Sequence, residues 1–410
     1  MNETKSTIVL RPVDIILILM SVLTLIKLII CYTSWGEYLY HLMWGFDDRT
    51  LFYDHFDHIK YCLVGNIKGV YGVNVNACFP ALAYLYYGFL AHLCAADQVD
   101  VTEFKHVFST NSGLITLVFV YGFILSAIIL VLYKHLHEKI GSLKTTWLIF
   151  MMLFSTIFIM TVASGNLAIG AMLLTLTSLY FRDSESPALR EFSMILLALA
   201  AGLKIYPAIW GMLYLKEKRF KEAFRLIGYG LFVFLFPFVF FGGVTGFVQF
   251  FRNIAAVSHV VTDITLVGLC EKVFSRFVDS PTAIAIGRVI DYIYLLATFL
   301  LVFLKKKIDW KSYALFAGAM FIFNAESGSY CMCYWTIALV FFVREIGNLE
   351  RTGPLEMLYA VLFAFSFNAI PIFSLGSSVI PASCLYAIVL IIMIDGFLEV
   401  IRDIRRTSNA

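Results

Sequence analysis

The sequence has few charged residues: only 14% of its 410 residues are Asp, Glu, Lys or Arg, whereas 60% are hydrophobic. Its mean hydropathy of +0.85 lies far from the balance of a soluble globular domain. The net charge of +3 is too small to indicate a nucleic acid or another strongly charged partner. The composition therefore predicts an all-α polytopic membrane protein, in which the many aromatic side chains pack between helices or at the membrane interface.

Several local motifs are also missing. The eight cysteines contain no C-x-x-C pair and no metal-ligand spacing, although Cys62 and Cys78 lie near one polar segment and a bridge between them stays open. Neither a G-x-G-x-x-G nor a Walker motif is present. No fixed-period repeat or low-complexity linker divides the chain. We therefore expect a single integral membrane domain over residues 1–410.

Apolar runs long enough to cross the hydrocarbon layer, about 20 residues each, occur about twelve times. The first is too long for a signal peptide and lacks an Ala-x-Ala site, so we expect a retained anchor. Lys27, which lies inside it, is expected to snorkel or to pair within the bundle. The expected spans are 12–34, 76–95, 109–133, 145–163, 165–181, 192–215, 225–241, 284–304, 310–324, 331–346, 354–373 and 379–400.

Basic loops predict the orientation. With this span count the basic segments fall on one side, which the positive-inside rule makes cytoplasmic; they are 216–225, 305–307, 344–351 and 402–406. Both termini are then cytoplasmic, and 35–75 and 242–282 form two long outer loops. The lysine-rich segment 133–144 falls outside by the same count, so the topology between 109 and 215 stays open.

Acidic and imidazole side chains gather after the first span; they are Asp47, Asp48, Asp54 and Asp57, with His41, His55 and His58. If 50–61 is helical, Asp54, Asp57 and His58 share one face and His55 is turned away. Three interpretations stay open. The segment is a solvated loop, it supplies some ligands of a metal site, or one aspartate is a general base that takes a proton from an alcohol.

The stretch DHFDHIKYCLVGNIKGVYGVNVNACFPALAYLYYGFL, residues 54–90, resembles the opening of glycosyltransferase family 87. Asp54 matches the family's Asp-aromatic motif, Tyr71 its Gly-x-x-x-Tyr turn, and 79–82 its Tyr-Pro-Pro-Leu motif. His55 replaces an aromatic residue, and one proline is missing. The blocks SGNLAIGAMLLTL (164–176), AAGLKIYPAIWGMLYLKEKRFKEAF (200–224) and FFGGVTGFVQFFRNIAAVSH (240–259) continue the likeness, which covers roughly 50–260 and fades over the last 150 residues.

The resemblance implies a GT-C-type bundle, with a catalytic helical module over roughly 1–260 and C-terminal helices over roughly 284–400. It implies an inverting hexosyltransferase, mannose favoured, that uses a polyprenyl-phosphate-linked donor and a lipid or glycan hydroxyl as acceptor. The missing nucleotide-binding motifs agree with a donor dissolved in the bilayer. Because the likeness is to bacterial members, we expect a bacterial plasma membrane protein with its active site on the extracytoplasmic face.

The resemblance also suggests roles for individual residues. Asp54 is the expected general base because its spacing to Tyr71 fits the family, and Asp48 is the alternative. The expected ligands of the donor phosphate, which gains charge as it leaves, are Lys204, Arg252 and Arg288. The expected substrate-binding residues are Asp57, His58, Tyr71, Asn166, Tyr206, His259 and Glu326.

Other assignments stay open for some of these residues. Lys204 and Arg288 could instead form ion pairs, the latter with Asp291, and Asn166 could hydrogen-bond between helices. No cofactor is certain, although a divalent metal could bridge Asp48 and Asp54 to the phosphate. The rival functions are a transporter, a flippase or polymerase of polyprenyl-linked glycans, and a non-catalytic scaffold. The transporter would need two matched halves with broken helices, which the sequence does not show.

Overall fold

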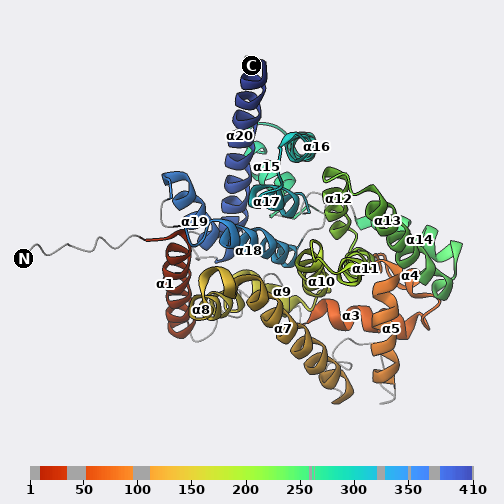
Figure 1. Cartoon of the computed structure of the whole chain (residues 1–410). Helices are drawn as coiled ribbons and strands as arrows, with labels where there is room; N and C mark the ends of the chain where they lie inside the picture. Colours follow the sequence, from red (N-terminus) through yellow and green to blue (C-terminus); the bar gives the residue numbers. More distant parts are fainter. Residues whose placement is uncertain are drawn as a thin grey trace, which may run out of the picture.

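The computed structural model describes residues 10–34, 52–95, 111–257, 261–262, 264–320, 328–349, 352–368 and 379–408. These residues form helices and no β-strand, so the all-α prediction is confirmed for them (Figure 1). The first half contains α1 (Pro12–Thr33), α3 (Tyr53–Val64), α4 (Val70–Val73), α5 (Ala81–Ala95), α7 (Asn111–Ile140), α8 (Ser142–Leu153), α9 (Thr156–Ser164), α10 (Ala168–Phe181) and α11 (Pro187–Leu203).

The second half mixes α-helices with short 3-10 helices, which are labelled η. It contains η1 (Tyr206–Gly211), α12 (Met212–Lys216), α13 (Phe220–Leu235), η2 (Phe236–Phe241), α14 (Val244–Val257), α15 (Leu266–Phe274), α16 (Ser280–Leu304), α17 (Trp310–Ala319), η3 (Ser329–Tyr334), α18 (Trp335–Glu345), α19 (Pro354–Phe367) and α20 (Val379–Ser408). The segment 242–282, expected as an outer loop, therefore holds two helices, α14 and α15.

The number of candidate membrane spans is five, or six if α8 and α9 form one bent span, among the residues that the structure describes. The count of about twelve is not confirmed. In the five candidates only 17% to 33% of the apolar window is buried, which leaves most of it available to lipid. In α10, by contrast, ten of 14 residues are buried. A helix that is apolar on all sides can be a protein core element as well as a span, and hydropathy alone does not separate the two.

The bend between α8 and α9 explains the position of Lys27. The two helices meet at 54°, and the break leaves the Phe154 carbonyl without a helical partner. The Lys27 ammonium on α1 donates to that carbonyl at 2.6 Å and to Asn368 Oδ1 at 3.3 Å. Lys27 is therefore bound within the bundle, which was the second of its two expected placements.

Lys27→Met should lower the thermal stability of the purified protein. The substitution keeps the apolar stem and leaves the Phe154 carbonyl without its donor, which costs about 1–3 kcal/mol. The midpoint of thermal unfolding in detergent measures the effect, and Lys134→Met, at an exposed position of α7, is the control. Equal midpoints for the two variants would show that the Lys27 contact does not stabilise the bend.

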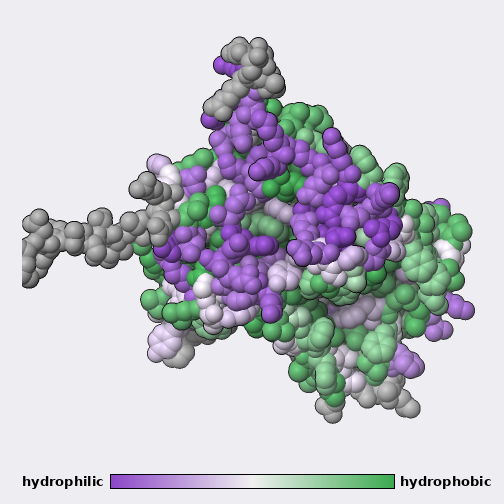
Figure 2. All heavy atoms as spheres, in the orientation of Figure 1, coloured by the Kyte–Doolittle hydropathy of each residue, from purple (hydrophilic) through white to green (hydrophobic). Residues whose placement is uncertain are grey.

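Hydrophilic side chains gather on one face of the molecule (Figure 2). We call the face that carries Lys139, Lys216, Lys306 and Arg344 the basic face. Lys144, in the first turn of α8, forms an ion pair with Asp14 of α1 at 2.7 Å. Lys216 donates to the Phe303 carbonyl at 2.7 Å, at the end of α16. The segment 133–144, which the span count put outside, also lies there, because Asn348 donates to the Lys139 carbonyl at 3.1 Å.

With 192–215 taken as one crossing, the basic segments 133–144 and 216–225 fall on opposite sides of the membrane. The structure divides this run into α11, which leaves the basic face, and η1 with α12, which return to it. Lys204, expected inside a span, lies at the reversal between them, with an extended backbone (φ −144°, ψ 130°) that ends α11. Pro207 follows three residues later and cannot continue the helix hydrogen bonding.

Candidate functional site

The start of α3 carries Asp54 and is docked against the end of α9. The Phe52 amide donates to the Ala163 carbonyl at 2.6 Å. Gly165, which ends α9, has a positive φ of 68°, and a Cβ there would lie 2.9 Å from Phe52 Cα and 2.9 Å from His55 Cβ. Only glycine fits this close approach. The helix expected over 50–61 is confirmed as α3, shifted a few residues toward the C-terminus.

Asn166 links this docked turn to the carboxylate of Asp54. Its Nδ2 donates to Asp54 Oδ2 at 2.7 Å, and its Oδ1 accepts a hydrogen bond from the Ala168 amide at 2.9 Å. The Asn166 side chain is thus held at both ends and is nearly fully buried. One oxygen of Asp54 is fixed in position by a residue 112 positions away in the sequence.

Lys204 is the third member of the site. It is buried, and its ammonium lies 3.3 Å from the centroid of the Phe79 ring and 5.6 Å from that of Tyr330. Burial lowers the pKa of Lys204, and the electrostatic attraction of Cys331 and then of Asp54 opposes this shift. Lys204 and Asp54 therefore interact electrostatically, and the Lys204 ammonium is shielded from water. We call Asp54, Asn166, Lys204 and Phe79 the Asp54 cluster.

Two of the expected substrate-binding residues support Phe79 from within a buried aromatic layer. The rings of His58 and Phe79 lie 3.9 Å apart, and His58 Nδ1 is 3.0 Å from the Tyr84 hydroxyl. Tyr71 is almost fully buried, and its hydroxyl donates to the Phe79 carbonyl at 2.9 Å. Burial, and then the charges of Lys204 and His55, hold the pKa of His58 well below its usual range. His58 thus packs against the Phe79 ring, which lies next to the Lys204 ammonium.

His55 is buried next to the Asp54 cluster. Both of its ring nitrogens lack a hydrogen-bond partner among the described residues, and its ring packs against Tyr87 and Tyr121. Burial lowers the pKa of His55 to about 4. It was expected to be turned away from the face of His58, yet both rings pack on Tyr87.

The remaining sequence candidates lie elsewhere or outside the described residues. Arg252 on α14 and Arg288 on α16 are exposed, and no described ion pair joins Arg288 to Asp291. Asp57 accepts a hydrogen bond from the Tyr61 hydroxyl at 3.3 Å. The Tyr206 hydroxyl lies 3.9 Å from Cys331 Sγ. Three candidates, Asp48, His259 and Glu326, lie outside the described residues.

A metal site has no support in the part of the chain that the structure describes. Those residues contain no group of three or more His, Cys, Asp or Glu side chains placed to hold a metal ion. The bridging hypothesis also needs Asp48, which lies outside them. Asp54 is bound by the Asn166 amide, whose NH₂ group cannot ligate a cation through its hydrogens.

Sequence reasoning missed Tyr330 and Cys331, which approach Lys204 from η3. They lie in the last 150 residues, where the family likeness fades. The signal that points to them is the Gly328-Ser329 break followed by the dense aromatic and sulfur run 330–335. The role of Asn253 was also missed: its Nδ2 donates to the carbonyls of Tyr71 and Ala77, both at 2.9 Å, and fixes the turn before Phe79.

Gly165→Ala should lower activity by displacing Asp54. The added Cβ meets the backbone of Phe52, so α3 must move away from Asn166. Gly141→Ala is the matched control: Gly141 also has a positive φ of 82°, yet no atom lies within 4 Å of the position that a Cβ would take there. Both variants lose about 1–3 kcal/mol through backbone strain. Equal activities at matched folded amounts would contradict the docking role of Gly165.

The fold and the site together define an integral membrane protein in which a half-buried carboxylate, a buried amide and a buried lysine lie at the ends of packed helices. Residues 106–325 match the model of glycosyltransferase family 87, which is more than half of the chain. The chain belongs to this family, as the sequence motifs predicted, and is therefore a membrane glycosyltransferase. The match includes Asn166 and Lys204 and does not extend to Asp54. Neither the curated proteins nor the solved structures contain a match.

Proposed function

We propose that this protein transfers a hexose, with mannose favoured, from a polyprenyl-phosphate-linked donor to a hydroxyl of a lipid or glycan acceptor, with inversion at the anomeric carbon. The observation that carries the proposal is the Asp54 cluster. It places a carboxylate, held by Asn166 at 2.7 Å, in the electrostatic field of a buried lysine. A glycosyl transfer of this kind needs an acceptor for one proton and a cation for one leaving phosphate.

Asp54 acts as the general base in this proposal. As the acceptor oxygen forms a bond to the anomeric carbon, its proton passes to the carboxylate. Asn166 binds one carboxylate oxygen and so orients the other toward the acceptor. Asp48 is the alternative base, since it precedes α3 in the same acidic segment.

Lys204 acts as the ligand of the leaving phosphate. The bond between the anomeric carbon and the phosphate oxygen breaks, and the phosphate keeps the electron pair and gains negative charge. An ammonium in a place shielded from water stabilises this charge more than it would in bulk solvent. Phe79 holds Lys204 by a cation–π contact that a phosphate can replace. Asp57 and Tyr206 would contact the sugars, and the exposed Arg252 and Arg288 are further phosphate candidates.

The proposed transfer takes place on the side opposite the basic face. Helix α10 ends on the basic face and α11 begins there, on either side of residues 182–186. At the opposite ends of the two helices, Asn166 precedes α10 and Lys204 follows α11. Helices of this length span about 20–25 Å. Because basic loops favour the cytoplasm, the Asp54 cluster would be extracytoplasmic, in a bacterial plasma membrane.

The test is transfer of radiolabelled sugar from polyprenyl-phosphate-mannose, -glucose and -arabinose in membranes with and without the protein. Labelled product that depends on the protein and on mannose donor supports the proposal. Transfer only from another donor corrects the sugar. No transfer from any donor, together with transport of a polyprenyl-linked glycan, would replace the proposal with the flippase alternative.

A further inference from the structure

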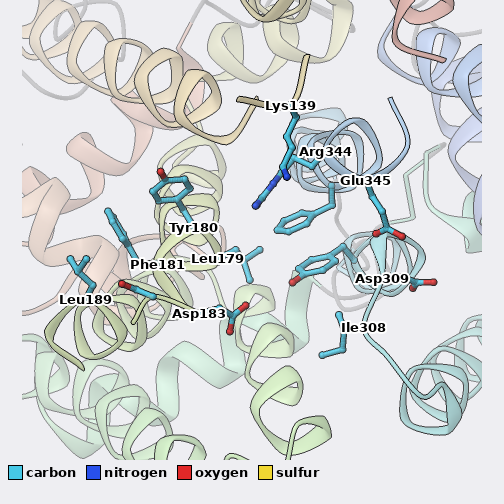
Figure 3. Close-up of a pocket in the computed structure, with 13 residues that line it drawn as sticks. Lys139, Leu179, Tyr180, Phe181, Asp183, Leu189, Ile308, Asp309, Arg344 and Glu345 are labelled. Carbon is cyan, nitrogen blue, oxygen red and sulfur yellow. The ribbon is translucent and has the colours of Figure 1, made fainter. Parts of the chain in front are cut away.

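The basic face contains a cavity of about 490 Å³ where the turn after α10, the end of α12 and the segment after α16 meet. Its charged lining residues are Arg182, Asp183, Lys216, Glu217, Lys306 and Lys307. It adjoins a larger cavity of about 820 Å³, and the two share Asp183, Ile308 and Tyr313 (Figure 3). Four cations therefore face two carboxylates in the smaller cavity.

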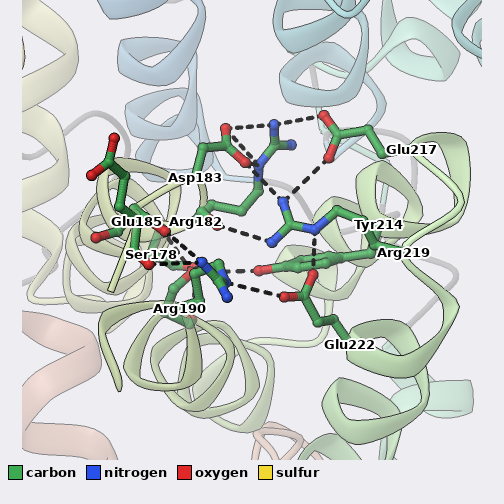
Figure 4. A network of polar contacts seen from close by, with 11 residues as sticks. Ser178, Arg182, Asp183, Glu185, Arg190, Tyr214, Glu217, Arg219 and Glu222 are labelled. Carbon is green, nitrogen blue, oxygen red and sulfur yellow. Dashed lines mark hydrogen bonds and ion pairs between the residues drawn. The ribbon is translucent and has the colours of Figure 1, made fainter. Parts of the chain in front are cut away.

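The two carboxylates are already neutralised by arginine (Figure 4). Asp183 pairs with Arg182 and with Arg219, each at 2.8 Å, and Glu217 pairs with Arg182 at 2.9 Å. Hydrogen bonding to and attraction by Arg182 and Arg219 lower the pKa of Asp183, although burial opposes this shift. The three lysines are thus a surplus of positive charge that the cavity's own acids do not offset.

Among the described residues, none of the three lysines forms an ion pair with Asp183 or Glu217. Lys216 binds the backbone carbonyls of Phe303 and Lys305. Lys306 pairs at 3.0 Å with Asp403, and the two side chains are 76% and 36% exposed, so the pair contributes little. Lys307 is exposed and forms no ion pair within the described residues.

Arg182 supplies a second, independent observation. Its side chain is only 4% exposed, and its Nε and Nη2 atoms donate to carboxylates. Its Nη1, however, is buried without any hydrogen-bond partner among the described residues. A buried guanidinium N–H without an acceptor costs free energy. Because Arg182 lines the cavity, a shift of its side chain would let an oxyanion bound there accept from this N–H.

We propose that this cavity is a binding site for a phosphate monoester group, held by Arg182, Lys216, Lys306 and Lys307. The cavity lies at the end of α16 and near the start of α13, two candidate spans, so its ligand comes from the height of lipid headgroups or from the adjoining solution. Both sources present the same tetrahedral oxyanion. The site is separate from the Asp54 cluster by the length of α10 and does not depend on the proposed transfer reaction.

The experiment measures binding to the purified full-length protein in two arms. One arm uses radiolabelled inorganic phosphate, and the other uses nanodiscs containing phosphatidic acid, with phosphatidylcholine as the neutral comparison. Lys307→Gln and the double variant Lys306→Gln/Lys307→Gln test the site without touching the Arg182 network. Arg182→Gln is added with a thermal unfolding check, and Lys134→Gln is the matched control at an exposed lysine that lines neither cavity.

We expect Lys307→Gln to weaken binding about tenfold through the loss of one charge-assisted contact, with no change for Lys134→Gln. Binding of phosphate in solution identifies a soluble source. Retention of phosphatidic acid without phosphate binding identifies a lipid headgroup. If neither ligand binds, or if the lysine variants bind both as tightly as the wild type, the proposed site is wrong.

Discussion

Asp54→Asn should reduce sugar transfer by about 100- to 10,000-fold, the usual contribution of a general base. The substitution keeps the shape of the side chain and removes its ability to take the acceptor's proton. The Asn166 amide, which donates to Asp54 Oδ2 at 2.7 Å, can still donate to the new amide oxygen. The measurement is the initial rate of transfer at saturating donor, with folded protein quantified by size-exclusion chromatography.

A control separates the loss of a base from the loss of a charge. Glu138→Gln removes an exposed carboxylate on the basic face, far from Asp54, and should leave the rate unchanged. Donor binding by Asp54→Asn should persist, since the phosphate contacts Lys204 in the proposed arrangement. Full activity in Asp54→Asn would exclude Asp54 as the base and leave Asp48 as the candidate.

Lys204→Met should reduce kcat/KM by about 100- to 1,000-fold, the size of effect seen when one group that stabilises developing charge is removed. Methionine keeps the apolar length that packs over Phe79 and removes the ammonium. Because burial already lowers the pKa of Lys204, the folded protein should tolerate the neutral side chain. The midpoint of thermal unfolding should therefore stay near that of the wild type.

Lys204→Arg distinguishes a phosphate ligand from a packing role. Arginine keeps the positive charge, so Lys204→Arg should be more active than Lys204→Met. If Lys204 were needed only for packing, the longer arginine side chain would not restore activity. Lys134→Met controls for the loss of a lysine at an exposed site. If Lys204→Met retained the wild-type kcat/KM, the phosphate ligand would have to be Arg252 or Arg288.

Three members of the Asp54 cluster were named as site residues from the sequence, but Phe79 and the association of the four were not. Short family-like motifs identified all three, with Asp54 chosen by its spacing to Tyr71. Their contacts join segments more than 100 residues apart, which depend on how α3, α10 and α11 pack. Local patterns do not contain that information. His58 illustrates the limit: its place on the helix was predicted, whereas its burial between Phe79 and Tyr87 was not.

The membrane topology shows a different limit. The basic segments were predicted to share one face, and the contact of Lys216 with the Lys305 carbonyl joins two of them. The expected number of spans is not confirmed, because α10 and α18 are as apolar as lipid-facing helices but most of their residues are buried among other helices. A hydropathy window measures how apolar a helix is, and the neighbours of that helix decide whether lipid or protein covers it.

Helices α10 and α11 form a hairpin whose closed end lies on the basic face. Near that end, Ser178 and Ser193 exchange hydrogen bonds between hydroxyl and carbonyl groups at 2.8 and 2.9 Å. The open end carries Asn166 and Lys204. Since a helix of this length extends about 25 Å, opening the hairpin by about 5° would move its free ends apart by about 2 Å. Residues at the closed end therefore set the distance between Asn166 and Lys204. If these residues bind the donor as proposed, substitutions there should change the size of sugar that is accepted.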